Sequence, residues 1–178
     1  PLDVLEVLAD HPRMCKYIDL PIQHIADSVL RSMRRGISGK SLHHLLDTIR
    51  ERVPGVVLRT TLSVGYPGEG QEEFEELLDF VRVSKFERLG VFPYSREEGT
   101  HAFPLGDPVP PAKKERRQSL VMELQQEISE NRNAGLVGTR QRVLLDREEE
   151  GLFVGRTEHD APEIDNEVLV RGGTRLKT

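Results

Sequence analysis

Segments with helical spacing of apolar residues alternate with short apolar segments through most of the chain, and this alternation limits the fold more than any other feature. Helical spacing occurs over residues 2–8, 27–35, 42–53, 71–81 and 112–132. Strand-like segments lie between them at 16–20, 56–64 and 89–94. Strands that alternate with helices in this way form parallel βα units, so the sequence predicts an α/β domain with a parallel sheet. Gly36 is expected to end the second helix, because glycine adopts the left-handed conformation of a helix C-terminus without strain.

The pattern changes beyond Gly135 to short alternating runs separated by acidic and proline-containing turns. These runs are residues 143–145, 152–154 and 168–170. Short runs with turns between them are typical of antiparallel strands, so the sequence predicts a small antiparallel β-barrel that is incomplete at Thr178. We therefore expect two domains, at residues 1–134 and 135–178.

Composition and charge exclude several classes of protein. The net charge of -5 argues against a general nucleic-acid-binding surface. No apolar run approaches the roughly 20 residues of a membrane span, and the chain begins with no signal peptide, so we expect a cytoplasmic protein without a membrane partner. The start, which is not methionine and lies inside an amphipathic pattern, suggests a piece of a longer protein.

Cys15 is the single cysteine of the chain. One chain can therefore form neither a disulfide framework nor a zinc knuckle. Because Cys15 lies beside Met14 and near Tyr17, we predict a buried, structural thiol and not a reactive one.

Polar side chains follow the first predicted strand, at the end where ligands gather in parallel βα folds. Gln23 can both donate and accept hydrogen bonds, as a ribose or an amino-acid group requires, and His24 is next to it. The alternative is that both residues only cap the following helix. His24 has no second potential ligand nearby in the sequence, so no metal site is predicted.

The next two strands carry further candidate ligand-binding residues. Arg59 can clamp a carboxylate, Thr61 adds a hydroxyl, and Gly65 would let a ligand approach the backbone, although such a glycine is also ordinary turn chemistry. Phe92 and Tyr94 offer aromatic rings at a strand end, as an adenine site would, or are simply part of the core. No cluster pairs a nucleophile with an activator or an acid with a base, so the residues predict a ligand-binding α/β domain without a catalytic side chain.

Five motifs occur in an order and spacing that resemble the methylthiotransferases of the radical S-adenosylmethionine superfamily. They are Tyr17–His24 (YIDLPIQH), Ser32–Gly36 (SMRRG), Val64–Glu69 (VGYPGE), Phe92–Thr100 (FPYSREEGT) and Gly155–Asp165 (GRTEHDAPEID). Together they extend over nearly the whole chain. The pair Gln23-His24 combined with residues 160–165 is similar to the branch that modifies a ribosomal protein, more than to the branch that modifies tRNA.

The resemblance implies that residues 1–134 are the C-terminal part of a radical S-adenosylmethionine barrel of partial TIM type, followed by a truncated TRAM domain. Enzymes of this branch add a methylthio group to the β-carbon of an aspartate in a small-subunit ribosomal protein. They use S-adenosyl-L-methionine, two 4Fe-4S clusters and an electron donor. The cofactor contacts implied for this chain are Gln23, Arg59, Thr61, Gly65, Phe92 and Tyr94. The substrate contacts implied are His24, Asp160, Glu163 and Asp165.

The chain lacks the cysteines that would bind either cluster, since thiolates are the required ligands and Cys15 matches neither set. We therefore expect this chain alone to be inactive, with the missing N-terminal part of the same enzyme as its partner. From Arg140 to Lys177 the sequence holds seven basic and nine acidic residues, and acidic turns could steer a basic ribosomal protein. Two alternatives stay open, a parent enzyme that modifies tRNA and a non-catalytic module that binds the ribosome or RNA.

Overall fold

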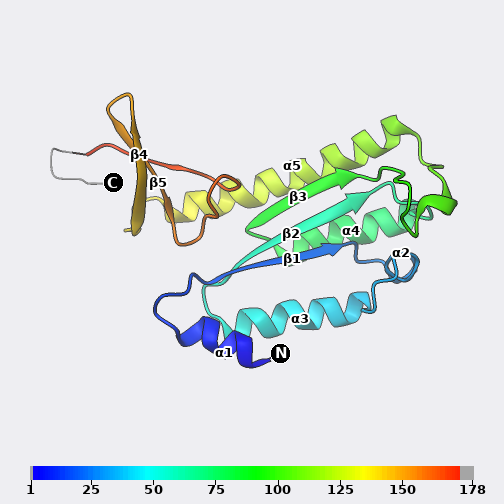
Figure 1. The fold of residues 1–178 in the computed structure, drawn as a ribbon, viewed down its shortest axis with the longest axis horizontal. Helices are drawn as coiled ribbons and strands as arrows, with labels where there is room; N and C mark the ends of the chain where they lie inside the picture. Colours follow the sequence, from blue (N-terminus) through cyan, green and yellow to red (C-terminus); the bar gives the residue numbers. More distant parts are fainter. Residues whose placement is uncertain (1, 173–178) are drawn as a thin grey trace.

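The structure, a computed structural model, describes residues 2–172 and consists of a parallel α/β unit followed by a small antiparallel sheet (Figure 1). The α/β unit contains α1 (Leu2–Asp10), β1 (Tyr17–Gln23), α2 (Asp27–Ser32), α3 (Gly39–Arg52), β2 (Val57–Val64), α4 (Gln71–Ser84), β3 (Arg88–Pro93), the 3-10 turn η1 (Phe103–Leu105) and α5 (Pro111–Leu136). The antiparallel unit contains β4 (Val143–Glu149), β5 (Leu152–Thr157) and β6 (Val168–Val170). Within residues 2–172 no helix is both long and apolar enough to cross a membrane.

The parallel sheet has the order β1-β2-β3, with β2 in the centre. Leu58, Leu62 and Val64 of β2 are almost completely buried against the helices. The residues between them, Arg59, Thr61 and Ser63, are only half-buried and lie on the opposite face, which we call the open face. The strand predicted at residues 56–64 is therefore confirmed, and the alternation of its side chains divides the sheet into an apolar face and a polar one.

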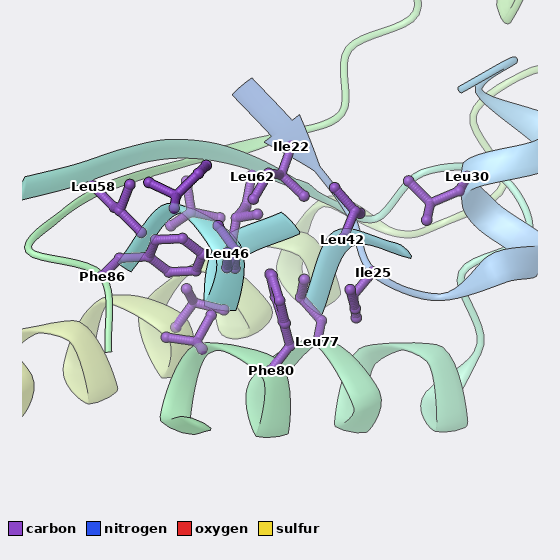
Figure 2. Close-up of a cluster of buried hydrophobic side chains, with 14 of the residues drawn as sticks. Ile22, Ile25, Leu30, Leu42, Leu46, Leu58, Leu62, Leu77, Phe80 and Phe86 are labelled. Carbon is purple, nitrogen blue, oxygen red and sulfur yellow. The ribbon is translucent and has the colours of Figure 1, made fainter. Parts of the chain in front are cut away.

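The larger of two apolar clusters joins the buried face of the sheet to α1, α3, α4 and α5. Figure 2 shows Phe80 of α4 and Phe86 beside Leu46 of α3 and Leu58 of β2. The two phenylalanine rings meet edge to face with 5.5 Å between their centroids. Each side chain of this size contributes about 1.5–3 kcal/mol when fully buried. This core fixes the helices behind the sheet and leaves the strand ends free to carry a site.

The second helix differs from the prediction, because α2 ends at Ser32 and Gly36 is not its stop. Arg34 adopts the left-handed conformation, with φ 57°. The amide N–H of Arg35 donates to the carbonyl of Leu30 at 2.8 Å, which closes the helix end two residues before the glycine. A left-handed arginine therefore ends this helix. A rule that places the end of a helix at a glycine does not predict it.

The predicted burial of Cys15 is wrong. Its side chain is exposed in the loop between α1 and β1. The apolar neighbours that suggested burial do not enclose it, since Met14 is itself exposed.

The antiparallel unit is a three-stranded sheet with the order β4-β5-β6. Gly155 of β5 lies so close to the backbone of Leu144 in β4 that a Cβ would collide with it. The sheet confirms the antiparallel strands predicted beyond Gly135. The predicted barrel is present over the described residues as this three-stranded sheet; residues 173–178, which include Arg175 and Lys177 of the charge count, lie outside the described residues.

Candidate functional site

A cavity of about 310 Å³ lies at the C-terminal ends of the parallel strands. It is open to solvent and is lined by the ends of β1, β2 and β3, the C-terminal end of α2 and the loop before η1. Its lining residues are Gln23, Met33, Arg35, Ser63, Tyr66, Tyr94, Thr100, His101 and Ala102. The volume is at the lower end of the range for small-molecule sites. This is the end of a parallel sheet where ligands bind.

Gln23 reaches the cavity because β1 is irregular at its end. Pro21 has no N–H to give to the ladder, and the pairing with β2 shifts between Leu20 and Gln23. The hydroxyl of Thr60 donates to the carbonyl of Leu20 at 2.8 Å. This side-chain hydrogen bond replaces one of the backbone hydrogen bonds that β1 and β2 lack at this point. The chain then turns through Gln23, whose φ is 75°. Proline and threonine together aim the side chain of Gln23 at the cavity.

Five of the six predicted cofactor-binding residues divide into two groups. Gln23 and Tyr94 line the cavity. Arg59, Thr61 and Phe92 lie along the open face, where Thr61 is side by side with Gly90, and Phe92 is side by side with Ser63 at the cavity. Phe92 is 61% exposed, and its ring leans over Gly90, where a side chain would meet it at 3.4 Å. The open face therefore presents a hydroxyl and a bare aromatic ring next to the cavity.

Arg59 is already paired inside the chain. Its Nη1 donates to Oδ2 of Asp19 at 2.9 Å, across the β1–β2 pair. The same arginine lines a second cavity, of about 710 Å³, beside β3 and α5. The predicted contact of Arg59 with the cofactor stays a prediction, and it would require this ion pair to rearrange.

His24 is fully buried behind the cavity. Its Nδ1 accepts a hydrogen bond from the N–H of Ala26 at 3.1 Å, so the proton of the neutral ring is on Nε2. That nitrogen lies 3.4 Å from a carboxylate oxygen of Glu69. A direct contact of His24 with substrate stays a prediction, because the structure gives this side chain a supporting position and no exposed surface.

Glu69 and Arg117 complete this buried network. Glu69 ends one of the five sequence motifs, but nothing in the sequence indicated Arg117 or the pairing of the two. Oε1 of Glu69 accepts from Nη1 of Arg117 at 2.5 Å, and both side chains are at most 3% exposed. Nη2 of Arg117 also donates to the carbonyl of Gly70 at 2.6 Å. The N–H of Gly65 donates to the other oxygen of Glu69 at 2.9 Å. One carboxylate thus connects the ends of β1 and β2 to α5.

Gly65 is held by packing within the chain. Its φ is 74°, and a Cβ at this position would collide with Cγ of Lys114. Nζ of Lys114 donates to the carbonyl of Tyr94 at 2.7 Å and pairs with Asp107 at 2.5 Å. The predicted approach of a ligand to Gly65 stays a prediction, but the positive φ and the packing of Lys114 already require a glycine at this position.

Tyr94 meets the ring of Tyr66 edge to face, with 5.2 Å between the centroids. Burial, followed by the nearby Tyr66 and Asp107, raises the pKa of Tyr94 above the ordinary tyrosine value. Its phenol therefore keeps its proton at neutral pH and serves as a hydrogen-bond donor.

The acidic residues predicted to contact substrate lie at the other end of the sheet. Asp160 pairs with Arg88 at the start of β3, and Asp165 accepts from the hydroxyl of Tyr17 at 2.6 Å. Nε of Arg88 lies 3.6 Å from Asp165. Both carboxylates are almost fully buried, so they hold the antiparallel unit against the N-terminal ends of β1 and β3. Only Glu163 of the predicted set is exposed.

The residues present fit S-adenosylmethionine but not an iron–sulfur cluster. A nucleoside needs an aromatic surface and hydrogen-bonding groups, and Phe92, Thr61, Ser63 and Gln23 provide them on the open face and in the cavity. The cluster needs thiolates, and the only one in the chain, Cys15, lies at the opposite end of β1. Within residues 2–172 no group of three or more histidine, cysteine or acidic side chains could hold a metal ion.

Comparison with known proteins agrees with this architecture. Residues 1–81 match the radical SAM superfamily model, and residues 137–178 match the TRAM domain model. A solved structure, coproporphyrinogen III oxidase (HemN) from Escherichia coli, has 22% sequence identity and a TM-score of 0.49, and covers 78% of this chain and 31% of that one. That likeness is too low to add to the assignment.

Curated relatives match almost the whole chain. Ribosomal protein uS12 methylthiotransferase RimO of Cytophaga hutchinsonii is 49% identical over 96% of the chain, and the protein of that name from Flavobacterium johnsoniae is 52% identical over the same share. That of Christiangramia forsetii is 48% identical over 100% of the chain. The chain spans 39–40% of the length of these relatives. Because the radical SAM and TRAM matches and the relatives agree, the chain belongs to the methylthiotransferase family of radical S-adenosylmethionine enzymes.

Proposed function

We propose that this chain forms the substrate-facing part of an enzyme that adds a methylthio group to the β-carbon of an aspartate in ribosomal protein uS12. The observation that carries the proposal is the identity of about half of all residues with proteins named for this reaction. The geometry supports it, because the polar open face and the cavity lie where a radical SAM barrel needs its ligands. A ribosomal-protein substrate would place the reaction in the cytoplasm.

The chain's own residues would bind and orient the cofactor and the acceptor. The ring of Phe92 would stack on the adenine, while Thr61 and the amide of Gln23 would hydrogen-bond the ribose or the amino-acid part. Tyr94 and Tyr66 would limit the entry of water beneath them. When bound beside a reduced cluster, S-adenosylmethionine supplies the hydrogen-abstracting chemistry that an unactivated C–H bond requires.

The cluster-binding portion must come from outside this sequence. Because Cys15 cannot ligate two 4Fe-4S clusters, we propose a cysteine-bearing N-terminal portion of the same enzyme as the partner, and an electron donor that reduces it. Two units follow from this arrangement, residues 1–134 as the end of the barrel and residues 135–178 as the TRAM unit. The end of α5 at Leu136 and the start of the TRAM match at residue 137 support a boundary close to this position.

The exposed acidic surface of the TRAM unit would attract a basic protein. Glu148, Glu150 and Glu163 are exposed, whereas Asp160 and Asp165 are occupied by Arg88 and Tyr17. We therefore propose that Glu163 and residues 148–150, at the end of β4 and the start of the turn after it, contribute most to substrate attraction, through a higher rate of encounter.

The test is a reaction with the protein that carries this chain together with the cysteine-bearing portion. It would be purified without oxygen, its iron measured, and then incubated with uS12, S-adenosylmethionine, a sulfur source and a reductant. A gain of one methylthio group on an aspartate of uS12, seen by peptide mass spectrometry, is the expected result. Two clusters without any change in uS12 would refute the proposal.

The tRNA-modifying alternative rests on the same fold. Its test is the same incubation with unmodified tRNA, followed by nucleoside analysis. The acidic balance from Arg140 to Lys177 argues against this substrate, since a surface that binds RNA should be basic. A protein that contains no iron and binds ribosomes would instead support the non-catalytic module.

A further inference from the structure

The cavity at the strand ends has a cationic residue and no acidic one. Its lining includes one arginine, Arg35, together with the amide of Gln23 and the hydroxyls of Ser63 and Thr100. No aspartate or glutamate is among the lining residues. A cavity with this set of groups favours a ligand that carries a negative charge and accepts hydrogen bonds.

The backbone on which Arg35 stands is fixed. The N–H of Arg35 donates to the carbonyl of Leu30 at 2.8 Å, within the cap of α2. The hydroxyl of Tyr66 donates to the carbonyl of Ser32 at 3.2 Å, which attaches the end of α2 to the loop after β2. Tyr66 also packs in a buried cluster with Ala26 and Val29. The backbone position of Arg35 is therefore set before any ligand binds, which lowers the part of the ordering cost that falls on the backbone.

The other arginines near the sheet are already engaged. Arg59 pairs with Asp19, Arg117 with Glu69, and Arg88 with Asp160. In contrast, no carboxylate among residues 2–172 lies within ion-pairing distance of Arg35. The planar guanidinium of Arg35 is thus available for a bidentate contact at the edge of the cavity.

We propose that Arg35 binds a carboxylate in this cavity. The inference rests on the proposed function, which supplies two molecules with a carboxylate. One is the methionine part of S-adenosylmethionine, and the other is the acceptor aspartate, whose β-carbon is bonded to its carboxylate. Binding of either carboxylate at Arg35 would orient the ligand, with the amide of Gln23 and the hydroxyl of Ser63 within the same cavity to donate further hydrogen bonds.

The test uses the complete cluster-containing protein and three variants, Arg35→Gln, Arg35→Lys and Arg31→Gln. Arg31 is the matched control, because it stands on α2, four residues before Arg35, is exposed and does not line the cavity. Isothermal titration measures the binding of S-adenosylmethionine, of a uS12 peptide with the acceptor aspartate, and of the same peptide with asparagine. The expected loss for Arg35→Gln is about tenfold to a hundredfold for one carboxylate ligand.

The pattern of losses identifies the carboxylate. Weaker binding of S-adenosylmethionine assigns the contact to its methionine part. Weaker binding of the aspartate peptide, with little change for the asparagine peptide, assigns it to the acceptor. Arg35→Lys should lose less than Arg35→Gln, which shows that charge and not folding is responsible, and Arg31→Gln should bind as the unsubstituted protein does.

Unchanged affinity for both ligands in Arg35→Gln would overturn the inference, as would an equal loss in Arg31→Gln. A failure of the proposed function can be told apart from a failure of this inference. If the unsubstituted protein modifies no aspartate of uS12, the reaction is wrong, whereas the titration with S-adenosylmethionine still decides whether Arg35 binds its carboxylate.

Discussion

Single residues at the strand ends explain why the loops around the cavity keep their shape. Gly65 accepts a left-handed conformation, which leaves room for the stem of Lys114, and Lys114 in turn holds the carbonyl of Tyr94. The sequence marks Gly65 as a turn glycine that a ligand could approach. Its neighbour Lys114 lies 49 positions further along the chain, so no local pattern could relate the two.

Gly65→Ala should lower the free energy of unfolding by about 2–4 kcal/mol, because left-handed strain and collision with Lys114 add. Gly68→Ala is the matched control. Gly68 also has a positive φ, of 97°, but no atom lies within 4 Å of the added Cβ, so the expected loss is about 1–2 kcal/mol. Denaturant titration of both variants measures the difference, and equal losses would show that the packing of Lys114 is unimportant.

The buried pair of Glu69 and Arg117 is the second feature that the sequence does not reveal, since the two residues are 48 positions apart. Arg117→Met should cost about 3–5 kcal/mol, because the carboxylate of Glu69 would remain buried without its partner. Adding Glu69→Gln should recover part of this loss. The exposed pair of Arg82 and Asp79 provides a control, and Arg82→Gln should cost at most about 1 kcal/mol in the same denaturant titration.

At the scale of whole elements, the pattern of apolar residues predicted the positions of the strands well. It predicted poorly where an irregular strand or helix ends. The central strand β2 follows its sequence pattern because one face is buried and the other is not. The extension of β1 past Pro21 and the early end of α2 depend on Thr60 and on the left-handed Arg34, which are tertiary or backbone details. Of the predicted cofactor residues, the two that reach the cavity, Gln23 and Tyr94, stand at or directly after strand ends.

The contact between the start of β1 and the loop after β5 should depend on pH. Burial, and then the hydrogen bond to Asp165, raises the pKa of Tyr17 above its ordinary value of about 10. A raised pKa in the folded state means that the contribution of Tyr17 is fully present below about pH 10 and declines as the pH rises further. Tyr17→Phe should therefore be less stable at about pH 8, and the difference should shrink at about pH 11.

Thermal unfolding of both proteins across this range measures the effect of Tyr17. Lysines and other tyrosines titrate in the same range in both proteins, so only the difference between the two curves reports on Tyr17. A difference that stays constant from pH 8 to pH 11 would show that the hydrogen bond to Asp165 does not depend on the phenol proton.

In the whole molecule the TRAM sheet and the cavity lie at opposite ends of the parallel strands (Figure 1). Arg88 and Tyr17 hold the TRAM unit at the N-terminal ends, and β2 alone, with its eight residues, extends about 26 Å from there to the cavity. An acceptor that contacts both places must extend along the open face. If the acceptor is the proposed ribosomal protein, the folded protein can do so, whereas a short peptide around the acceptor aspartate reaches only the cavity.

Arg88→Gln should therefore separate the two kinds of substrate. Without the ion pairs of Arg88 to Asp160 and Asp165, the TRAM unit loses its fixed orientation. The contact of intact uS12 with the TRAM unit then no longer strengthens its contact with the cavity, so kcat/KM for intact uS12 should fall about tenfold or more. The rate with a short acceptor peptide should stay nearly unchanged. Arg142→Gln, which removes an exposed pair with Glu158 in the same unit, should affect neither substrate. Initial rates with both substrates decide the matter, since an equal loss for peptide and protein would mean that Arg88 supports the cavity itself and that the TRAM unit does not position the acceptor.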